Sequence, residues 1–129
     1  MVNSKIKIIV VEDEAMIAMD IQEKLIDMGY DVPLTVDNGI DALKYAGLES
    51  PDLFLMDIVI KGELDGIQTA ERIKKIYGIP SLFLTAYDNS TVMERIKEVN
   101  PLGYLLKPFE DSKLQEIILQ LQINDRLSG

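Results

Sequence analysis

The stretch Leu53-Phe54-Leu55-Met56-Asp57 decides the fold, because four apolar residues lead directly to a carboxylate. A short, continuous apolar run bounded by turns is typical of a strand buried on both faces, as in a parallel sheet. Ser50-Pro51-Asp52 supplies the turn before the run, and residues 58–66 form a polar loop after it. We therefore expect a central strand over 53–56, with Asp57 at its carboxyl end.

Four other stretches are predicted to be strands. The second of them contains Pro33, which has no backbone N–H for a ladder, so we expect that strand at an edge of the sheet. The fourth strand, after the central one, ends at Thr85. The four predicted strands are Ile6–Val11, Asp31–Val36, Pro80–Leu84 and Gly103–Leu106.

Helical periodicity separates and follows the strands. Apolar residues recur at helix spacing in five segments, which are 17–28 ending at Gly29, from Asp37 or Asn38 to about Ala46, 67–77, 92–99 ending at Asn100-Pro101, and 114–121. Strands that alternate with helices predict an α/β fold with a parallel sheet covered on both faces. We expect a single domain over 1–129, with a core of about 5–123 and a frayed tail over 124–129. No effector domain follows Leu127 in this sequence, which is either a complete protein or a piece of a longer one.

The composition excludes several functions. The net charge of −9 argues against direct binding to nucleic acid or to an anionic membrane. The chain has neither cysteine nor histidine, which rules out disulfides, a Ser-His-Asp triad and an imidazole metal site. It also lacks a signal peptide and an apolar run of membrane-spanning length. We therefore expect a cytoplasmic protein.

Five chemically useful residues follow the predicted strands. They are Glu12, Asp13, Asp57, Thr85 and Lys107. Open parallel sheets bind ligands outside the carboxyl ends of their strands, so these side chains should converge. Three carboxylates repel one another, and oxygen-only ligands favour Mg²⁺ or Mn²⁺. A carboxylate can also accept a phosphoryl group, which a lysine and a hydroxyl would stabilise.

These residues lie in short motifs whose order and spacing are highly specific together. Over nearly its whole length the chain resembles the receiver domain of two-component response regulators, the CheY-like superfamily. The resemblance implies a flavodoxin-like, doubly wound (βα)₅ fold with strand order 2-1-3-4-5. The matching pieces are Val10-Val11-Glu12-Asp13-Glu14, Leu55-Met56-Asp57, Asp65-Gly66, Leu84-Thr85-Ala86 and Leu106-Lys107-Pro108-Phe109.

The resemblance implies a role for each residue around the phosphoacceptor. Asp57 would be the phosphorylation site, and a sensor histidine kinase or histidine phosphotransfer protein would supply the phosphoryl group. Asp13 would bind Mg²⁺ directly, and Glu12 would act through a metal-bound water. The backbone carbonyl of Val59 would complete the metal site. Such a domain assists its own phosphorylation and dephosphorylation but is not otherwise an enzyme.

Further residues would carry the signal outward. Thr85 and Lys107 would bind the phosphoryl group, and the Lys107–Pro108 peptide would be cis. Tyr104 matches an aromatic switch residue that turns inward together with Thr85, although an aromatic in a strand is equally a packing residue. The output face would combine segments 92–99, 103–106 and 114–121, and a phosphorylation-dependent dimer could form through it.

The chain differs from the usual receiver pattern in one loop, and three alternative functions compete with this interpretation. Many receivers carry Met-Pro shortly after the phosphoacceptor, whereas this chain has Val59-Ile60-Lys61-Gly62 in a loop longer by one residue. An enzyme of the haloacid-dehalogenase type would need a second acid where Val59 stands. A pseudo-receiver that never takes phosphate is disfavoured by the intact strand-end residues. A nucleotide-binding domain would need a P-loop or a glycine fingerprint, and the sequence has neither.

Overall fold

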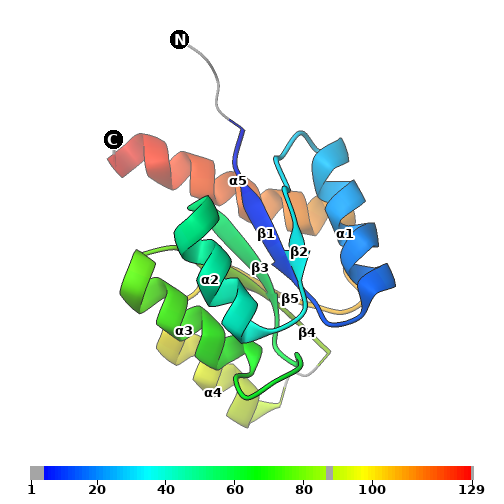
Figure 1. Cartoon of the computed structure of the whole chain (residues 1–129). Coiled ribbons are helices and arrows are strands. Elements are labelled where there is room, and N and C mark those ends of the chain that lie inside the picture. Colours follow the sequence, from blue (N-terminus) through cyan, green and yellow to red (C-terminus); the bar gives the residue numbers. More distant parts are fainter. Residues whose placement is uncertain (1–4, 87–88, 129) are drawn as a thin grey trace.

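The computed structural model describes residues 5–86 and 89–128. Its strands form one five-stranded parallel sheet in the order β2-β1-β3-β4-β5, which confirms the predicted topology (Figure 1). The three strands at the centre are the most apolar, as burial on both faces requires. The strands are β1 (Ile8–Val11), β2 (Thr35–Val36), β3 (Leu53–Asp57), β4 (Ser81–Thr85) and β5 (Gly103–Leu106).

Helices cover both faces of this sheet (Figure 1). They are α1 (Ala15–Asp27), α2 (Gly39–Glu49), α3 (Gly66–Tyr77), α4 (Ser90–Val99) and α5 (Asp111–Ser128). One core cluster packs the sheet against α2, α3 and α4, and the other packs it against α1 and α5. No helix in the described part of the chain is long and apolar enough to cross a membrane.

Alternation along the strands divides the core into these two clusters. Phe54 and Met56 of β3 point into the cluster with α2, α3 and α4, whereas Leu53 and Leu55 point into the other. All four side chains are 0% exposed. Complete burial of such a side chain contributes roughly 1.5–3 kcal/mol, so β3 alone fixes both helical layers onto the sheet.

The strand register brings the carboxyl ends of the strands to one edge of the sheet. Asp57 pairs with Leu84 and Thr85 pairs with Leu106, so the residues at and just after these strand ends are neighbours. In Figure 1 this edge is at the bottom, where the loops after β1, β3 and β4 meet. The sequence-based expectation that the strand-end residues converge depends on this register.

The largest differences from the sequence-based expectation are in β2, α2 and α5. Strand β2 is only two residues long, and a single bridge between Lys7 and Asp31 replaces its predicted first half, because Pro33 interrupts the ladder. Helix α2 runs on to Glu49 and ends where Ser50 adopts a left-handed conformation. Helix α5 begins at Asp111 and continues to Ser128, because no glycine or proline interrupts the chain over 111–128. The tail over 124–128, expected to be frayed, is therefore helical in this structure.

Candidate functional site

Asp57 ends β3, a strand whose residues are all buried, and is itself 7% exposed. Both of its carboxylate oxygens have a hydrogen-bond donor. The backbone N–H of Val59 donates to Oδ1 at 3.1 Å, and the Lys107 ammonium donates to Oδ2 at 2.6 Å. A buried carboxylate needs such partners, because burial without them would favour the uncharged form. The local turn after β3 and a lysine 50 residues away therefore orient this group together.

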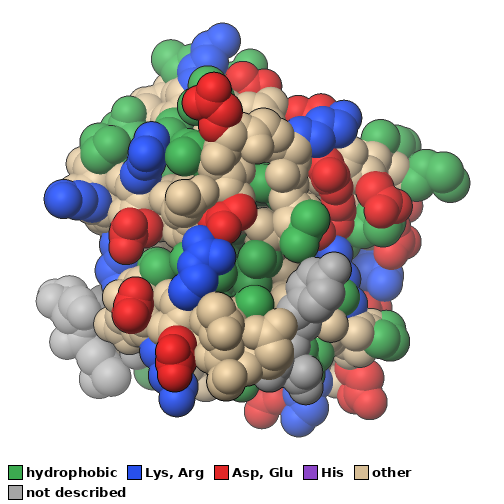
Figure 2. Space-filling view, turned by 90° about the horizontal axis from the view of Figure 1, so that it is seen from below, with side chains coloured by type: hydrophobic (Ala, Val, Ile, Leu, Met, Phe, Trp, Pro, Cys, Tyr) green, Lys and Arg blue, Asp and Glu red, His purple; other side chains and the backbone are tan. Residues whose placement is uncertain are grey.

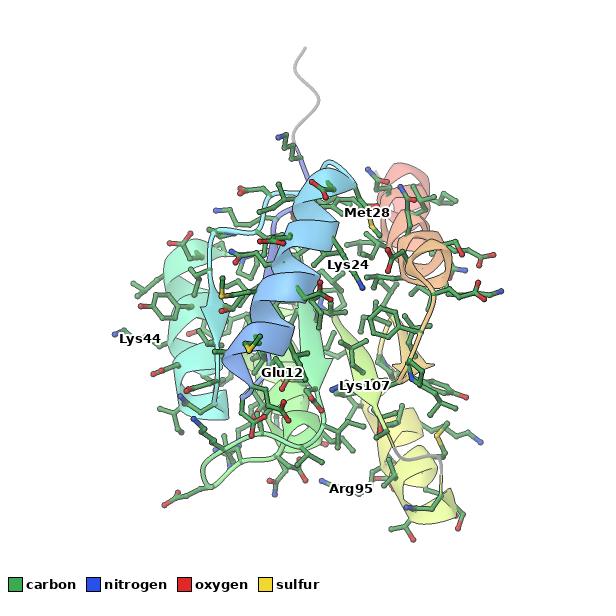
Figure 3. The ribbon with its side chains drawn as sticks, turned by 90° about the vertical axis from the view of Figure 1, so that its right-hand side faces the viewer. Glu12, Lys24, Met28, Lys44, Arg95 and Lys107 are labelled. Atoms are coloured by element: carbon green, nitrogen blue, oxygen red, sulfur yellow. The ribbon has the colours of Figure 1, made fainter. Side chains whose placement is uncertain are left out.

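Lys107 joins two carboxylates that lie on different strands. Its Nζ lies 2.6 Å from Asp57 Oδ2 and 3.1 Å from Glu12 Oε1 (Figure 3). Burial by itself would lower the pKa of Lys107, but the hydrogen bonds and negative charges of Asp57 and Glu12 outweigh burial and raise it. Lys107 is therefore a fixed cation, placed where β5 ends beside β4.

Glu12 and Asp13 follow β1 and differ in exposure. Glu12 is 3% exposed, and its Oε2 accepts a hydrogen bond from the backbone N–H of Glu14 at 3.1 Å. Asp13 is half-buried. Desolvation raises the pKa of Asp13 and the neighbouring Glu12 raises it further, whereas a backbone hydrogen bond and the positive charge of Lys61 partly offset both effects. A bound cation would therefore stabilise the charged form of Asp13.

A small cavity connects these groups at the carboxyl edge of the sheet. Its volume is about 230 Å³, and its lining residues are Glu12, Asp13, Glu14, Asp57, Val59, Ala86 and Lys107. The lining supplies only oxygen donors besides the lysine, which suits a hard cation such as Mg²⁺. Within residues 5–86 and 89–128, no three acidic side chains approach closely enough to hold an ion without rearrangement. The donor chemistry therefore fits Mg²⁺, provided that Lys107 gives up part of its contact with the carboxylates.

Figure 2 views this edge of the molecule from below. Acidic and basic side chains are mixed around a small hydrophobic centre, so this face does not have one sign of charge. The acidic excess of the whole chain is therefore partly balanced by basic side chains near the site.

Thr85 and Tyr104 occupy neighbouring strands behind the cavity. Thr85 ends β4 and is buried, and its carbonyl accepts a hydrogen bond from the Lys107 N–H at 2.8 Å. Tyr104 pairs with Phe83 in the ladder and is 43% exposed, so its ring lies at the surface in this structure. The Lys107–Pro108 peptide is cis, the form that the resemblance predicts.

Sequence analysis missed the role of the Asp65-Gly66 pair that begins α3. Asp65 Oδ1 accepts a hydrogen bond from the Gln68 N–H, and Gln68 Oε1 accepts one from the Asp65 N–H, which makes a capping box. An acid three residues before a glutamine is the sequence signal that could have predicted it. Gly66 packs so tightly on Asp57 that a Cβ atom would collide with the Asp57 carbonyl. Asp65 is half-buried, and its Oδ2 is paired with Arg95.

The longer loop after Asp57 has a defined place in the fold. Lys61 forms a backbone bridge with Asn38, and its Nζ lies 3.4 Å from Asp37 Oδ2. Gly62 follows with a φ of 94°, a conformation that glycine adopts without strain. The loop is therefore attached to the start of α2, and its insertion does not displace Asp57 or Val59 from the cavity.

The fold and this arrangement of carboxylates and lysine define a CheY-like, flavodoxin-like α/β domain. The sequence profile described as "Response regulator receiver domain" matches residues 8–119. The chain therefore belongs to the response regulator receiver domains of two-component signal transduction.

Individual relatives agree with this family. The chain is 35% identical over 108 residues to "Transcriptional regulatory protein PdtaR" of Mycobacterium tuberculosis, covering 84% of this chain and 52% of the relative. It is similar, at 33% identity and a TM-score of 0.90, to the signal receiver domain of a modulated diguanylate cyclase from Desulfovibrio desulfuricans G20, with 98% of this chain and 100% of that chain covered. A CheY-like receiver from Methanospirillum hungatei JF-1, 22% identical with a TM-score of 0.88 over 98% of this chain and 100% of that one, shares the fold. The chain spans about half the length of the curated relatives it matches, from 46% to 59% of them.

Proposed function

We propose that this domain accepts a phosphoryl group on Asp57 from a phosphohistidine of a sensor histidine kinase or histidine phosphotransfer protein. The main support is the Asp57 carboxylate itself, which lies at the cavity with Val59 N–H on one oxygen and Lys107 on the other. The 129 residues contain no histidine, so the phosphohistidine donor lies outside this domain.

The chain's own residues can support each part of the transfer. A carboxylate oxygen of Asp57 forms a bond to phosphorus while the phosphorus–nitrogen bond of the phosphohistidine breaks, and the bonding electrons return to the imidazole. The Val59 N–H holds the carboxylate in one orientation. Lys107, already beside Asp57, neutralises charge on the phosphoryl oxygens, and the Thr85 hydroxyl would donate a hydrogen bond to one of them.

Mg²⁺ or Mn²⁺ would be held by Asp13, Asp57 and the Val59 carbonyl, with Glu12 acting through water. When bound, the ion offsets the repulsion between these carboxylates and the incoming phosphoryl group. Support comes from the raised pKa of Asp13 and from the oxygen donors that line the same cavity. The contact between Lys107 and Glu12 would have to loosen as the ion enters.

The output would be a change at the face formed by α4, β5 and α5. Tyr104 of β5 is exposed on this face, and Thr85 lies on the neighbouring strand. A phosphoryl group on Asp57 would draw Thr85 toward it and leave room for the Tyr104 ring to turn inward. The face could then bind a partner or form a phosphorylation-dependent dimer. This is a shift in population between two states of one fold.

Intact-mass measurement tests the phosphoacceptor. With acetyl phosphate and Mg²⁺, the wild type should gain one phosphoryl group, and Asp57→Asn should gain none because the nucleophile is lost. Asp27→Asn, an exposed carboxylate on α1, is the matched control and should label like the wild type. Labelling of Asp57→Asn, or full labelling of the wild type in excess EDTA, would contradict the proposal. A wild type that never takes phosphate would indicate a pseudo-receiver.

A further inference from the structure

An ion pair joins α4 to the start of α3. Arg95 Nη2 lies 2.7 Å from Asp65 Oδ2, and the two side chains are 39% and 34% exposed. In Figure 3, Arg95 extends from α4 toward the loop after β3. Asp65 uses its other oxygen, Oδ1, to cap α3 through the Gln68 N–H at 2.8 Å. One carboxylate therefore holds the start of α3 and the middle of α4 at once.

Asp65 is also closely attached to the phosphoacceptor. The next residue, Gly66, donates its N–H to the Ile58 carbonyl at 2.8 Å and packs directly on the Asp57 carbonyl. The Thr69 hydroxyl, fully buried, donates to the Asp65 carbonyl at 2.8 Å. Because these groups are in direct contact, a movement of the backbone around Asp57 and Val59 also moves Asp65.

Helix α4 is held differently at its two ends. At its carboxyl end, Lys74 Nζ donates to the carbonyls of Val99 and Asn100 at 2.9 and 2.8 Å, and Val99 is buried. The first turns of α4 instead border a cleft with a volume of about 430 Å³. This cleft separates Asn89 and Val92 from the loop after β3. The cleft is lined by Ile58, Val59, Ile60, Asp65, Asn89, Val92 and Arg95. The amino-terminal half of α4 therefore has room to move, and Arg95 spans this space.

We propose that Arg95, in the middle of α4, is a positioning residue that ties this helix to the loop carrying the metal and phosphoryl site. A change at Asp57 then reaches α4 through Asp65 and Arg95, in addition to the chain that runs from Thr85 into α4. The inference rests on the proposed function, since it concerns how phosphorylation of Asp57 is transmitted. Because coupling is reciprocal, a partner that displaces α4 also changes the affinity of the site.

Two substitutions remove the ion pair between Arg95 and Asp65 without weakening the helices that carry these residues. Arg95→Met keeps a long helix-forming side chain and removes the charge. Asp65→Asn removes the opposite charge but keeps the helix cap, because asparagine caps as well as aspartate. Arg72→Met on α3 is the matched control, since Arg72 is exposed and makes no ion pair within the described residues.

Amide chemical shifts should be recorded for each protein with and without beryllofluoride and Mg²⁺, a mimic of aspartyl phosphate. In the wild type and in Arg72→Met, residues 58–66 and 90–96 should both respond. In Arg95→Met and Asp65→Asn, residues 58–66 should respond fully, whereas the population shift reported by 90–96 should fall by about 1.5- to 5-fold, the range for partly exposed ion pairs. The double variant should lose no more than either single variant.

Several outcomes would overturn the inference. An undiminished α4 response in Arg95→Met would show that the chain after Thr85 moves α4 by itself, and additive losses in the double variant would show that the two residues act separately. If Arg95→Met does not fold, Asp65→Asn decides alone, because its cap is kept. A wild type that shows no response at Asp57 and its neighbours would overturn the proposed function as well, whereas a response confined to 58–66 in the wild type would overturn only the coupling.

Discussion

At the scale of single residues, Lys107 makes the arrangement of carboxylates stable. Glu12 and Asp57 are almost fully buried, and two buried carboxylates so close together would be unfavourable without a cation between them. The ammonium of Lys107 contacts both. Asp13 forms no ion pair with the residues that the structure describes, and its pKa is raised by desolvation and by Glu12.

Asp13→Asn should therefore stabilise the metal-free protein. A carboxyl group whose folded pKa is raised destabilises the folded state at pH above that pKa, and this penalty disappears as the pH falls through it. Removing the charge should raise the free energy of unfolding at pH 7 by about 0.5–1 kcal/mol, as charge-relieving substitutions commonly do. Urea unfolding in EDTA, from pH 7 down to pH 4, should show the gain shrinking toward acid.

The exposed Glu23 on α1 provides the control for this experiment. Glu23→Gln removes a negative charge from α1 and not from the cavity, so it should change stability by less than Asp13→Asn. If Asp13→Asn is less stable than the wild type, or if its gain in free energy of unfolding grows toward acid pH, the charge of Asp13 does not destabilise the folded state.

At the scale of elements, the junction between β3 and α3 is rigid and closely packed. The strand ends at Asp57, Val59 of the following loop lines the cavity, and α3 begins directly against the strand end. Only glycine leaves enough space at position 66, because a Cβ would meet the backbone carbonyl of Asp57. The capping box at Asp65 then fixes the direction in which α3 leaves.

Gly66→Ala should lower the free energy of unfolding by about 1–3 kcal/mol, the usual cost of overpacking against groups that cannot move. The same substitution should also slow phosphorylation, because the backbone of Asp57 must shift to make room. Thermal unfolding and the rate of labelling by acetyl phosphate measure the two effects.

Gly47→Ala in α2 is the matched control. Its new Cβ would meet the hydroxyl of Tyr77, which is the end of a half-exposed side chain and can move aside. Helix propensity favours alanine, so Gly47→Ala should be neutral or slightly stabilising. Equal effects at positions 47 and 66 would contradict the packing argument.

At the scale of the whole molecule, folding brings part of the excess negative charge to the edge of the sheet where the strands end. The chain carries a net charge of −9, and the register of the sheet concentrates part of the acidic charge at one cavity. A divalent cation at this cavity would therefore bind the folded chain and not the unfolded one, because only folding brings these carboxylates together.

Mg²⁺ should consequently raise the melting temperature of the whole domain. At a concentration one hundred times the Kd, a ligand specific for the folded state stabilises it by about 2.7 kcal/mol. Asp13→Asn should lose most of this effect, whereas Glu23→Gln should keep it. Calorimetric scans with increasing MgCl₂, each matched in ionic strength with NaCl, measure it, and an equal rise in NaCl alone would exclude a specific site.

Local pattern was enough to predict the layers of this fold and the strand ends that bear its chemistry. The apolar run 53–56, bounded by turns, predicted a buried strand, and the alternation of strands with helices predicted a parallel sheet with two helical layers. Receiver motifs then located Glu12, Asp57 and Lys107, which the structure brings into contact. The spacing of apolar residues and the order of strands and helices depend on residues that are close in the sequence, so both can be predicted from the sequence.

Contacts between distant surface residues were decided by the tertiary structure alone. The pairing of Arg95 with Asp65 and the bonds from Lys74 to the end of α4 join residues 25–30 positions apart, and no local pattern distinguishes them from solvated charges. The attachment of Lys61 to the start of α2 is of the same kind. The physical reason is that an ion pair depends on where two helices and a loop come to lie, which the packing of the core decides after each element has formed.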